Sequence, residues 1–291
     1  MRIAVVGLGG VGGYLAASLA CTAHEVVGFA RGAHLEAIQK NGISVVEDTK
    51  TWHATCQAQT LQEASGTFDL VLFCVKGYDL LPSLEALRHA ITPQTILLSF
   101  ANGVENGEIL RQNAHAKVLD GCVYILSHIE KAGVIRKKGK VFAAVFGGER
   151  EASEKVAALF EEAALRYKTP ENIEEAIWKK YIFIAAFATL TSAYDAPIGV
   201  IYKEHYEEAK TLLEEIAAVA HAKGIDLHEE VQKALDTARD VPHDSSTSMH
   251  LDFQNNKQTE LETLSGTIVR EGAKLGVSTP LMKGFYEQLR G

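Results

Sequence analysis

Short hydrophobic runs alternate with amphipathic segments through the first half of the chain. The runs at residues 2–6, 25–29, 43–46, 69–75, 95–100 and 117–126 predict strands. Residues 132–147 predict further, antiparallel strands that extend one edge of the sheet. The segments between several of them, including 14–21, 33–41, 79–90 and 104–113, predict helices, and a helix over 153–167 closes this half. Such an alternation is typical of a mostly parallel, doubly wound α/β sheet.

The second half of the chain has a helical pattern almost throughout. The predicted helices cover residues 172–190, 203–223, 227–238, 246–253, 257–275 and 280–289. Gly224 and Gly276 follow helical runs as C-caps, and Pro280 suits the first turn of a helix. We therefore predict an α/β domain over 1–168 and an all-helical domain over 169–291, with substrate bound in a cleft between them.

Glycines interrupt the chain directly after its first strand. Gly7, Gly9 and Gly12 have the spacing G-x-G-x-x-G, and a helix and a second strand follow. This order is typical of the Rossmann-type pyrophosphate site, in which backbone N–H groups and the helix dipole hold the anion. The predicted cofactor contacts are Gly7, Leu8, Gly9, Gly10, Val11 and Gly12. The alternative is a glycine-rich turn that binds no ligand.

The end of the second strand indicates which dinucleotide is bound. NAD-selective sites usually place a carboxylate there, but residues 28–35 contain none, and Arg31 stands in its place. A guanidinium can bind a 2′-phosphate through two charge-assisted hydrogen bonds. We therefore predict NADPH/NADP⁺ as cofactor, although Arg31 could also be a solvated residue at the start of a helix.

Composition narrows the class of protein. A formal net charge of −8 without a basic block argues against nucleic-acid binding. The longest apolar stretch, 181–190, is too short to span a bilayer, and the chain begins in a predicted strand without room for a signal peptide. The four cysteines lie far apart and are expected to be buried, reduced thiols of a cytoplasmic protein. No histidine or cysteine pair has the spacing of a metal site.

Two lysines precede the most apolar helix of the second half. Lys179 and Lys180 stand directly before a run that begins Tyr-Ile-Phe-Ile-Ala-Ala-Phe. An ammonium partly buried among such neighbours loses hydration, which lowers its pKa and makes it a usable general acid. Two solvated lysines on a helix surface are the alternative.

The chain resembles the ketopantoate reductase (2-dehydropantoate 2-reductase) family along nearly its whole length. The matching features are the glycine motif with Arg31, a strand that ends in lysine, an Asn-Gly turn, a Trp-x-Lys helix, and a Ser-Met and Thr-Glu pair. In this chain they are Cys74–Lys76, Ala101–Val104, Trp178–Lys180, Ser248–Met249 and Thr259–Glu260.

The resemblance implies a role for each matching position. Lys180 would protonate the ketone oxygen of a 2-keto acid while NADPH delivers hydride, and Glu260 would bind the substrate hydroxyl and help to hold the lysine. Ser248 would bind the substrate carboxylate. Asn102 and Lys76 would contact both the nicotinamide end of the cofactor and the substrate. The family contains monomers and dimers, so a homodimer is possible.

One part of the helix departs from the family pattern. Family members often carry asparagines four and eight residues after the lysine, where this chain has Ile184 and Ala188. Replacement polar contacts could come from Thr189, Thr191, Ser192 or Tyr194, and His243 and His250 flank the serine cluster where an anionic substrate could bind. The predicted activity is reduction of ketopantoate. The alternatives are reduction of another keto acid by a paralogous enzyme and a non-catalytic NADP-binding regulator.

Overall fold

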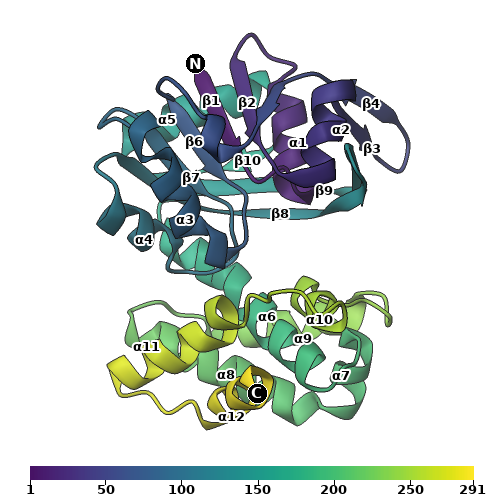
Figure 1. Cartoon of the computed structure of the whole chain (residues 1–291). Helices are drawn as coiled ribbons and strands as arrows, with labels where there is room; N and C mark the ends of the chain where they lie inside the picture. The colour runs from purple at the N-terminus through teal and green to yellow at the C-terminus, as the bar shows by residue number, and fades with distance from the viewer. The chain divides into compact units, whose positions relative to one another are not determined.

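A computed structural model describes all residues, 1–291, and the chain folds into two compact units. The sheet unit comprises Met1–Ala101 and Glu105–Ile173, and the helical unit comprises Asn102–Val104 and Glu174–Gly291 (Figure 1). The chain therefore passes between the units three times, since the short segment Asn102–Val104 leaves the sheet unit and returns to it.

The sheet unit is built on one mixed sheet with the strand order β4-β3-β9-β8-β7-β6-β1-β2-β5, and β10 pairs with β9. Strands β5, β2, β1, β6, β7 and β8 run parallel to one another, and β9 runs antiparallel to β8. The elements are β1 (Arg2–Val6), α1 (Gly10–Leu19), β2 (Glu25–Phe29), α2 (Gly32–Asn41), β3 (Ile43–Val46), β4 (Thr51–Ala54), β5 (Gln57–Gln59), β6 (Leu70–Phe73), α3 (Gly77–Leu87), β7 (Ile96–Ser99), α4 (Asn106–Asn113), β8 (Lys117–Lys131), β9 (Val134–Gly148), α5 (Arg150–Glu162) and β10 (Tyr167–Lys168), with short 3₁₀ turns at Leu61–Glu63 and Arg88–Ala90.

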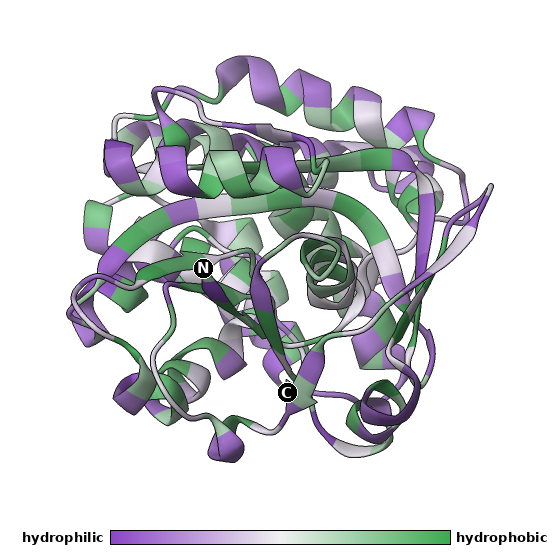
Figure 2. Cartoon of the chain, turned by 90° about the horizontal axis from the view of Figure 1, so that it is seen from above, coloured by the Kyte–Doolittle hydropathy of each residue, from purple (hydrophilic) through white to green (hydrophobic).

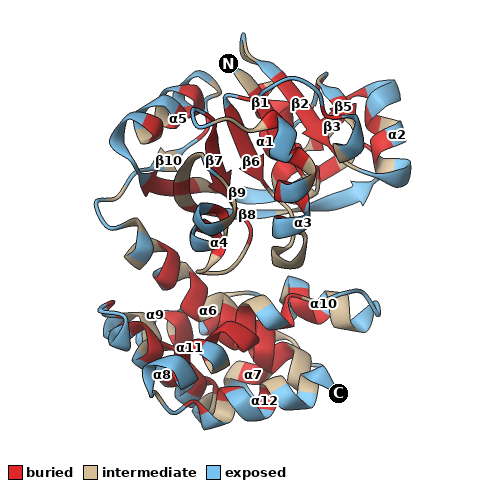
Figure 3. Ribbon diagram, turned by 60° about the vertical axis from the view of Figure 1, so that its left-hand side comes forward, coloured by how far each residue is buried: buried red, intermediate tan, exposed pale blue.

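Two apolar layers enclose this sheet. Successive strand residues point to opposite faces, so Ile3 and Val5 of β1 belong to one hydrophobic cluster and Ala4 and Val6 to the other. Figure 3 shows the buried strands in red, and in Figure 2 the helices alternate hydrophobic and hydrophilic residues. The predicted fold, a Rossmann-type sheet followed by a helical part, is confirmed.

Several sequence expectations for this unit were wrong in detail. The segment 132–147 lies in β9, which pairs antiparallel with β8 and extends the sheet as expected, but β3 and β4 lie beyond it and form the edge. The short strands β4 and β5 were not predicted. The first helix begins at Gly10 rather than Tyr14, because Gly10, Gly12 and Gly13 are already helical and Gly9 is the N-cap residue. All four cysteines are free, but Cys21 is exposed at the end of α1 and only Cys122 is fully buried.

The helical unit surrounds one long helix. Its elements are α6 (Ile173–Ala193), α7 (Ile198–Glu204), α8 (Tyr206–Ala222), α9 (His228–Asp240), α10 (Ser248–Gln254), a π-helical turn (Glu262–Gly266), α11 (Thr267–Leu275) and α12 (Pro280–Arg290). Gly276 caps α11 in the left-handed conformation, and Pro280 opens α12 as predicted. The expected helix 203–223 is two helices, which are separated at His205, and the expected helix 257–275 begins only at Leu261.

Helix α6 is the core of this unit. Trp178, Tyr181, Phe187 and Leu190 are all essentially inaccessible to solvent. No single helix of the chain is long and apolar enough to cross a bilayer, and α6 reaches that criterion only when it is joined to α7 across an 85° bend.

A buried carboxylate fixes the start of α12. Glu215 on α8 accepts hydrogen bonds of 2.8 Å from the N–H groups of Leu281 and Met282. We expect Glu215→Gln to lower the free energy of unfolding by about 2 kcal/mol, because one of these donors then faces an amide N–H₂. Urea unfolding measures the loss. Glu214→Gln is the matched control, since Glu214 is exposed and its carboxylate lies 3.9 Å from Lys210 Nζ, at the limit of an ion pair. Equal losses of unfolding free energy in both variants would contradict the capping role.

Candidate functional site

The glycine turn after β1 has the shape that a dinucleotide pyrophosphate requires. Gly7 has a φ of +89°, and a Cβ on Gly12 would lie 2.0 Å from the carbonyl oxygen of Gly7, so neither position accepts a side chain. A Cβ on Gly9 would meet nothing within 4 Å, which leaves open space beside its backbone. Helix α1 starts at Gly10 with no acidic residue in its first turn and no side-chain cap, so its N–H groups are oriented for an anion.

A histidine that the sequence did not single out supports this turn. His34 on α2 contacts the carbonyl oxygen of Leu8 through Nε2 at 2.8 Å, and its Nδ1 accepts from the N–H of Gly133 at 3.0 Å. These partners require a neutral imidazole with its proton on Nε2. Leu8 is buried, so it can serve a ligand only through its backbone. The side chain of His34 thus supports the glycine turn through the carbonyl oxygen of Leu8.

Three charged side chains lie beside the carboxyl ends of the strands that flank β1. Arg31 is the N-cap residue of α2, just after β2, and its side chain is 88% exposed. Asp79 lies in the first turn of α3, after β6, with its Oδ2 3.4 Å from Nη2 of Arg31. Lys76, the N-cap residue of α3, is half-buried at the end of β6. Strand order reverses between β1 and β6, and nucleotides bind at such switch points.

In the helical unit, three predicted site residues form one hydrogen-bonded chain. Lys180 Nζ donates to Asn102 Oδ1 at 3.1 Å, and Asn102 Nδ2 donates to Glu260 Oε2 at 3.5 Å. Glu260 is only 1% exposed, whereas Lys180 and Asn102 are half-buried. Asn102 therefore stands between the lysine and the carboxylate, with each end of its amide assigned by its partner. This arrangement presents an ammonium proton at a partly solvated surface.

Buried contacts of Tyr181 link the helix of Lys180 to the segment that follows Glu260. Tyr181, next to Lys180, donates its hydroxyl to the carbonyl oxygens of Leu264 at 2.5 Å and Thr263 at 3.1 Å. Both carbonyls belong to the π-helical turn that follows Glu260, and such turns occur frequently at functional sites. Trp178 packs edge-on against Tyr181. The contacts tie the lysine-bearing helix directly to the segment that carries Glu260.

The two residues that flank the short segment carrying Asn102 are close to a hydrogen bond that Asn106 donates to the backbone of Ala101. Gly103 has a φ of +118°, which a side chain would strain, and Asn106 donates to the carbonyl oxygen of Ala101 at 3.0 Å. That hydrogen bond joins the parts of the sheet unit that precede and follow Asn102–Val104. Asn102 itself counts with the helical unit because its neighbours are there.

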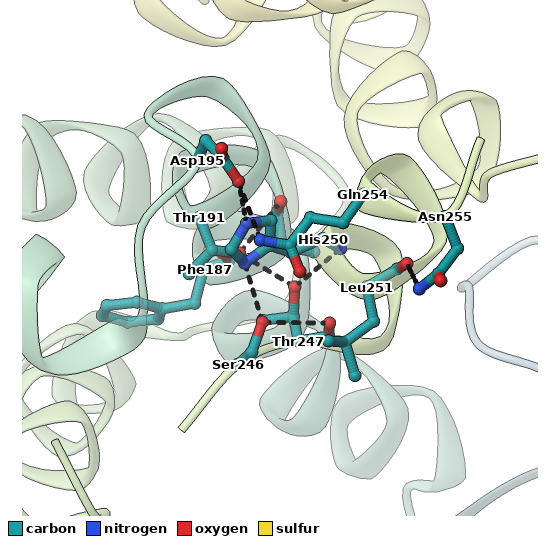
Figure 4. Close-up of polar contacts among 10 residues, drawn as sticks. Phe187, Thr191, Asp195, Ser246, Thr247, His250, Leu251, Gln254 and Asn255 are labelled. Carbon is teal, nitrogen blue, oxygen red and sulfur yellow. Dashed lines mark hydrogen bonds and ion pairs between the residues drawn. The ribbon is translucent and has the colours of Figure 1, made fainter. Parts of the chain in front are cut away.

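A polar network joins the end of α6 to the start of α10 (Figure 4). Thr191 Oγ1 lies 2.8 Å from Thr247 Oγ1, which also caps α10 by accepting from the N–H of His250. His250 contacts Asp195 through Nε2 and Ser246 through Nδ1, both at 2.7 Å. Hydrogen bonds from His250 and then Gln254 hold the pKa of Asp195 below its usual value. Ser248, predicted to bind substrate, follows the cap as the exposed first residue of α10.

This network answers one of the sequence hypotheses. His250 is buried, and both of its ring nitrogens already contact protein oxygens, so it does not offer an N–H to an anionic substrate. His243 is exposed and packs against Gly199.

The face of α6 beyond Lys180 is apolar. Ile184 is half-buried and Ala188 lies in the core. Three of the proposed replacement contacts are already engaged with protein atoms: Thr189 with Ser265 at 2.7 Å, Thr191 with Thr247, and Tyr194 with Glu208 at 2.7 Å. Ser192 Oγ is buried without a hydrogen-bond partner. Ser192 is therefore the one of these four side chains whose hydroxyl is not already paired with a protein atom.

Comparison with known proteins places both parts of the chain. Residues 3–148 match the family model "Ketopantoate reductase PanE/ApbA", and residues 172–291 match its C-terminal counterpart. A 2-dehydropantoate 2-reductase of Mesorhizobium japonicum is 28% identical, over 100% of this chain and 97% of its own.

Two crystal structures are similar over the whole chain. The 2-dehydropantoate 2-reductase of Porphyromonas gingivalis W83 has a TM-score of 0.86 and 35% identity, covering 100% of this chain and 99% of that one. The PanE/ApbA-family ketopantoate reductase of Ralstonia eutropha JMP134 has a TM-score of 0.93 and 29% identity, covering 100% and 97%.

Proposed function

Because the chain belongs to the ketopantoate reductase family, a family of pyridine-nucleotide-dependent oxidoreductases, we propose that it reduces a 2-keto acid with NADPH, and that ketopantoate is the substrate. The observation that carries the proposal is the chain of hydrogen bonds from Lys180 through Asn102 to Glu260. Homodimer formation remains a prediction.

Lys180 acts as the general acid in this proposal. When bound, reduced nicotinamide would supply the hydride for the carbonyl carbon. Lys180 Nζ would give a proton to the carbonyl oxygen, and solvent would reprotonate the neutral amine that remains. Asn102 Oδ1 holds the ammonium in place, and Glu260 fixes the amide of Asn102. The product is the 2-hydroxy acid.

The other predicted residues bind and orient in the proposal. The open backbone at Gly9 and the free N–H groups of α1 fit the pyrophosphate. The exposed guanidinium of Arg31 fits the 2′-phosphate. The hydroxyl of Ser248 would donate to the substrate carboxylate, and Lys76 would contact the nicotinamide end and the substrate.

The apolar face after Lys180 favours a second candidate, reduction of a keto acid whose side chain lacks the hydroxyl of ketopantoate. Ile184 and Ala188 offer no hydrogen bond to such a hydroxyl. A site built to bind a substrate hydroxyl rejects the analogue without it by a large factor, whereas an apolar wall discriminates weakly.

Comparison of ketopantoate with trimethylpyruvate tests both candidates, because the second compound has a methyl group where the first has hydroxymethyl. Oxidation of NADPH gives kcat/KM for each. A ratio of about 10⁴ in favour of ketopantoate supports the first candidate, and a ratio near one or below supports the second. The absence of turnover with both compounds and with a wider panel of 2-keto acids would contradict the proposed function.

A further inference from the structure

Arg31 and Asp79 reach the same place from the two strands that flank β1. Arg31 follows β2, Asp79 follows β6, and β1 lies between these strands in the sheet. Their side chains approach to 3.4 Å, and both retain contact with solvent, Arg31 at 88% and Asp79 at 33% exposure. The pair therefore lies at the carboxyl edge of the sheet, where the glycine turn leaves β1.

We propose that Asp79 is a specificity-determining residue for the cofactor, which weakens the preference for NADPH set by Arg31 and allows the chain to bind NADH as well. The inference rests on the proposed function only in that a pyridine nucleotide occupies the glycine turn.

The charges explain why Asp79 acts against the 2′-phosphate. A guanidinium that binds a 2′-phosphate would bring this dianion next to the carboxylate that now lies 3.4 Å from it, and like charges at such separations repel. Arg31 must therefore either leave Asp79 or hold both anions at once. The opposing effect of the carboxylate lowers the affinity for NADPH relative to a site with Arg31 alone.

The same carboxylate suits the cofactor without the phosphate. A ribose 2′-hydroxyl is a hydrogen-bond donor, and NAD sites use a carboxylate to accept from it. The usual carboxylate at the end of the second strand is missing from residues 28–35. Asp79 supplies one from the neighbouring helix instead, with Arg31 free to remain paired with it while NADH is bound.

Equilibrium binding of NADPH and NADH, followed by nucleotide fluorescence without substrate, tests the proposal on the full chain. For the unmodified protein we expect the two Kd values to lie within about tenfold of each other. Asp79→Asn should tighten NADPH about tenfold, because a neutral amide no longer repels the phosphate, and should weaken NADH about threefold. Arg31→Ala should weaken NADPH about thirtyfold and leave NADH within about twofold.

Glu108→Gln is the matched control for the change in net charge. Glu108 also lies in the first turn of a helix of the sheet unit and also faces an arginine, Arg111, at 3.7 Å. It should move neither Kd. The proposal is overturned if Asp79→Asn shifts both nucleotides equally or neither. The binding assay contains no substrate, and keto acid turnover is measured separately. Absence of turnover would therefore contradict the proposed function without changing the conclusion about Asp79.

Discussion

We expect Lys180→Ala to lower kcat for keto acid reduction by about a thousandfold and to leave the Kd for NADPH within about twofold. General acid catalysis typically contributes a factor in this range. In the proposed mechanism the ammonium of Lys180 is the proton donor, and its Nζ donates a hydrogen bond to Asn102 Oδ1 at 3.1 Å. Steady-state kinetics and cofactor fluorescence on the same preparation separate the loss of chemistry from a loss of binding.

The neighbouring lysine provides the control. Lys179 is exposed and pairs with Glu175 one turn earlier, at 2.5 Å, on the outside of α6. Lys179→Ala should therefore retain kcat within about twofold, since an exposed helix pair contributes little to stability. Equal activity of the two variants would exclude Lys180 as the general acid.

We expect Asn102→Ala to lower kcat by about a hundredfold. The substitution removes the acceptor for Lys180 and the donor for Glu260 together, and a small misplacement of a catalytic group costs about this factor. The pH profile identifies the cause. In Asn102→Asp a second carboxylate favours the ammonium form of the lysine, so the basic limb of the kcat profile should move to higher pH.

A merely structural role for Asn102 would lower activity without moving the profile. Asn113→Ala is the control, because the amide of Asn113 bonds only the carbonyl of Ile109 one turn earlier in the sheet unit. We expect it to leave kcat and the profile unchanged.

The sequence predicted the features that depend on local order. The glycine spacing, the alternation of strands and helices, and the lysines before an apolar run are readable because each is set by residues close together in the chain. Even there the helix boundaries moved, as at Gly10 and Leu261, since tertiary contacts decide where a helix starts.

The features that escaped prediction are contacts between residues far apart in the sequence, which the assembled fold brings together. Asp79 is 48 residues from Arg31 and reaches it because β2 and β6 flank β1. His34 supports the glycine turn from a helix that reads as an ordinary amphipathic segment. The hydrogen bond between buried His250 and exposed Asp195 spans 55 residues. No spacing within the chain marks such pairs, because their proximity follows from the assembled fold.

The helical unit contains residues from two separate parts of the sequence, Asn102–Val104 and Glu174–Gly291. This limits where the chain can be cut or recombined with a relative. A fragment that begins at Glu174 would contain Lys180 and Glu260 but would lack the amide that joins them, since Asn102 is inserted from the first half of the sequence. Exchange of the cofactor-binding half with that of a relative would likewise import a foreign partner for the lysine. Activity in such chimaeras depends on transplanting three residues, Asn102–Val104, together with the helices they join.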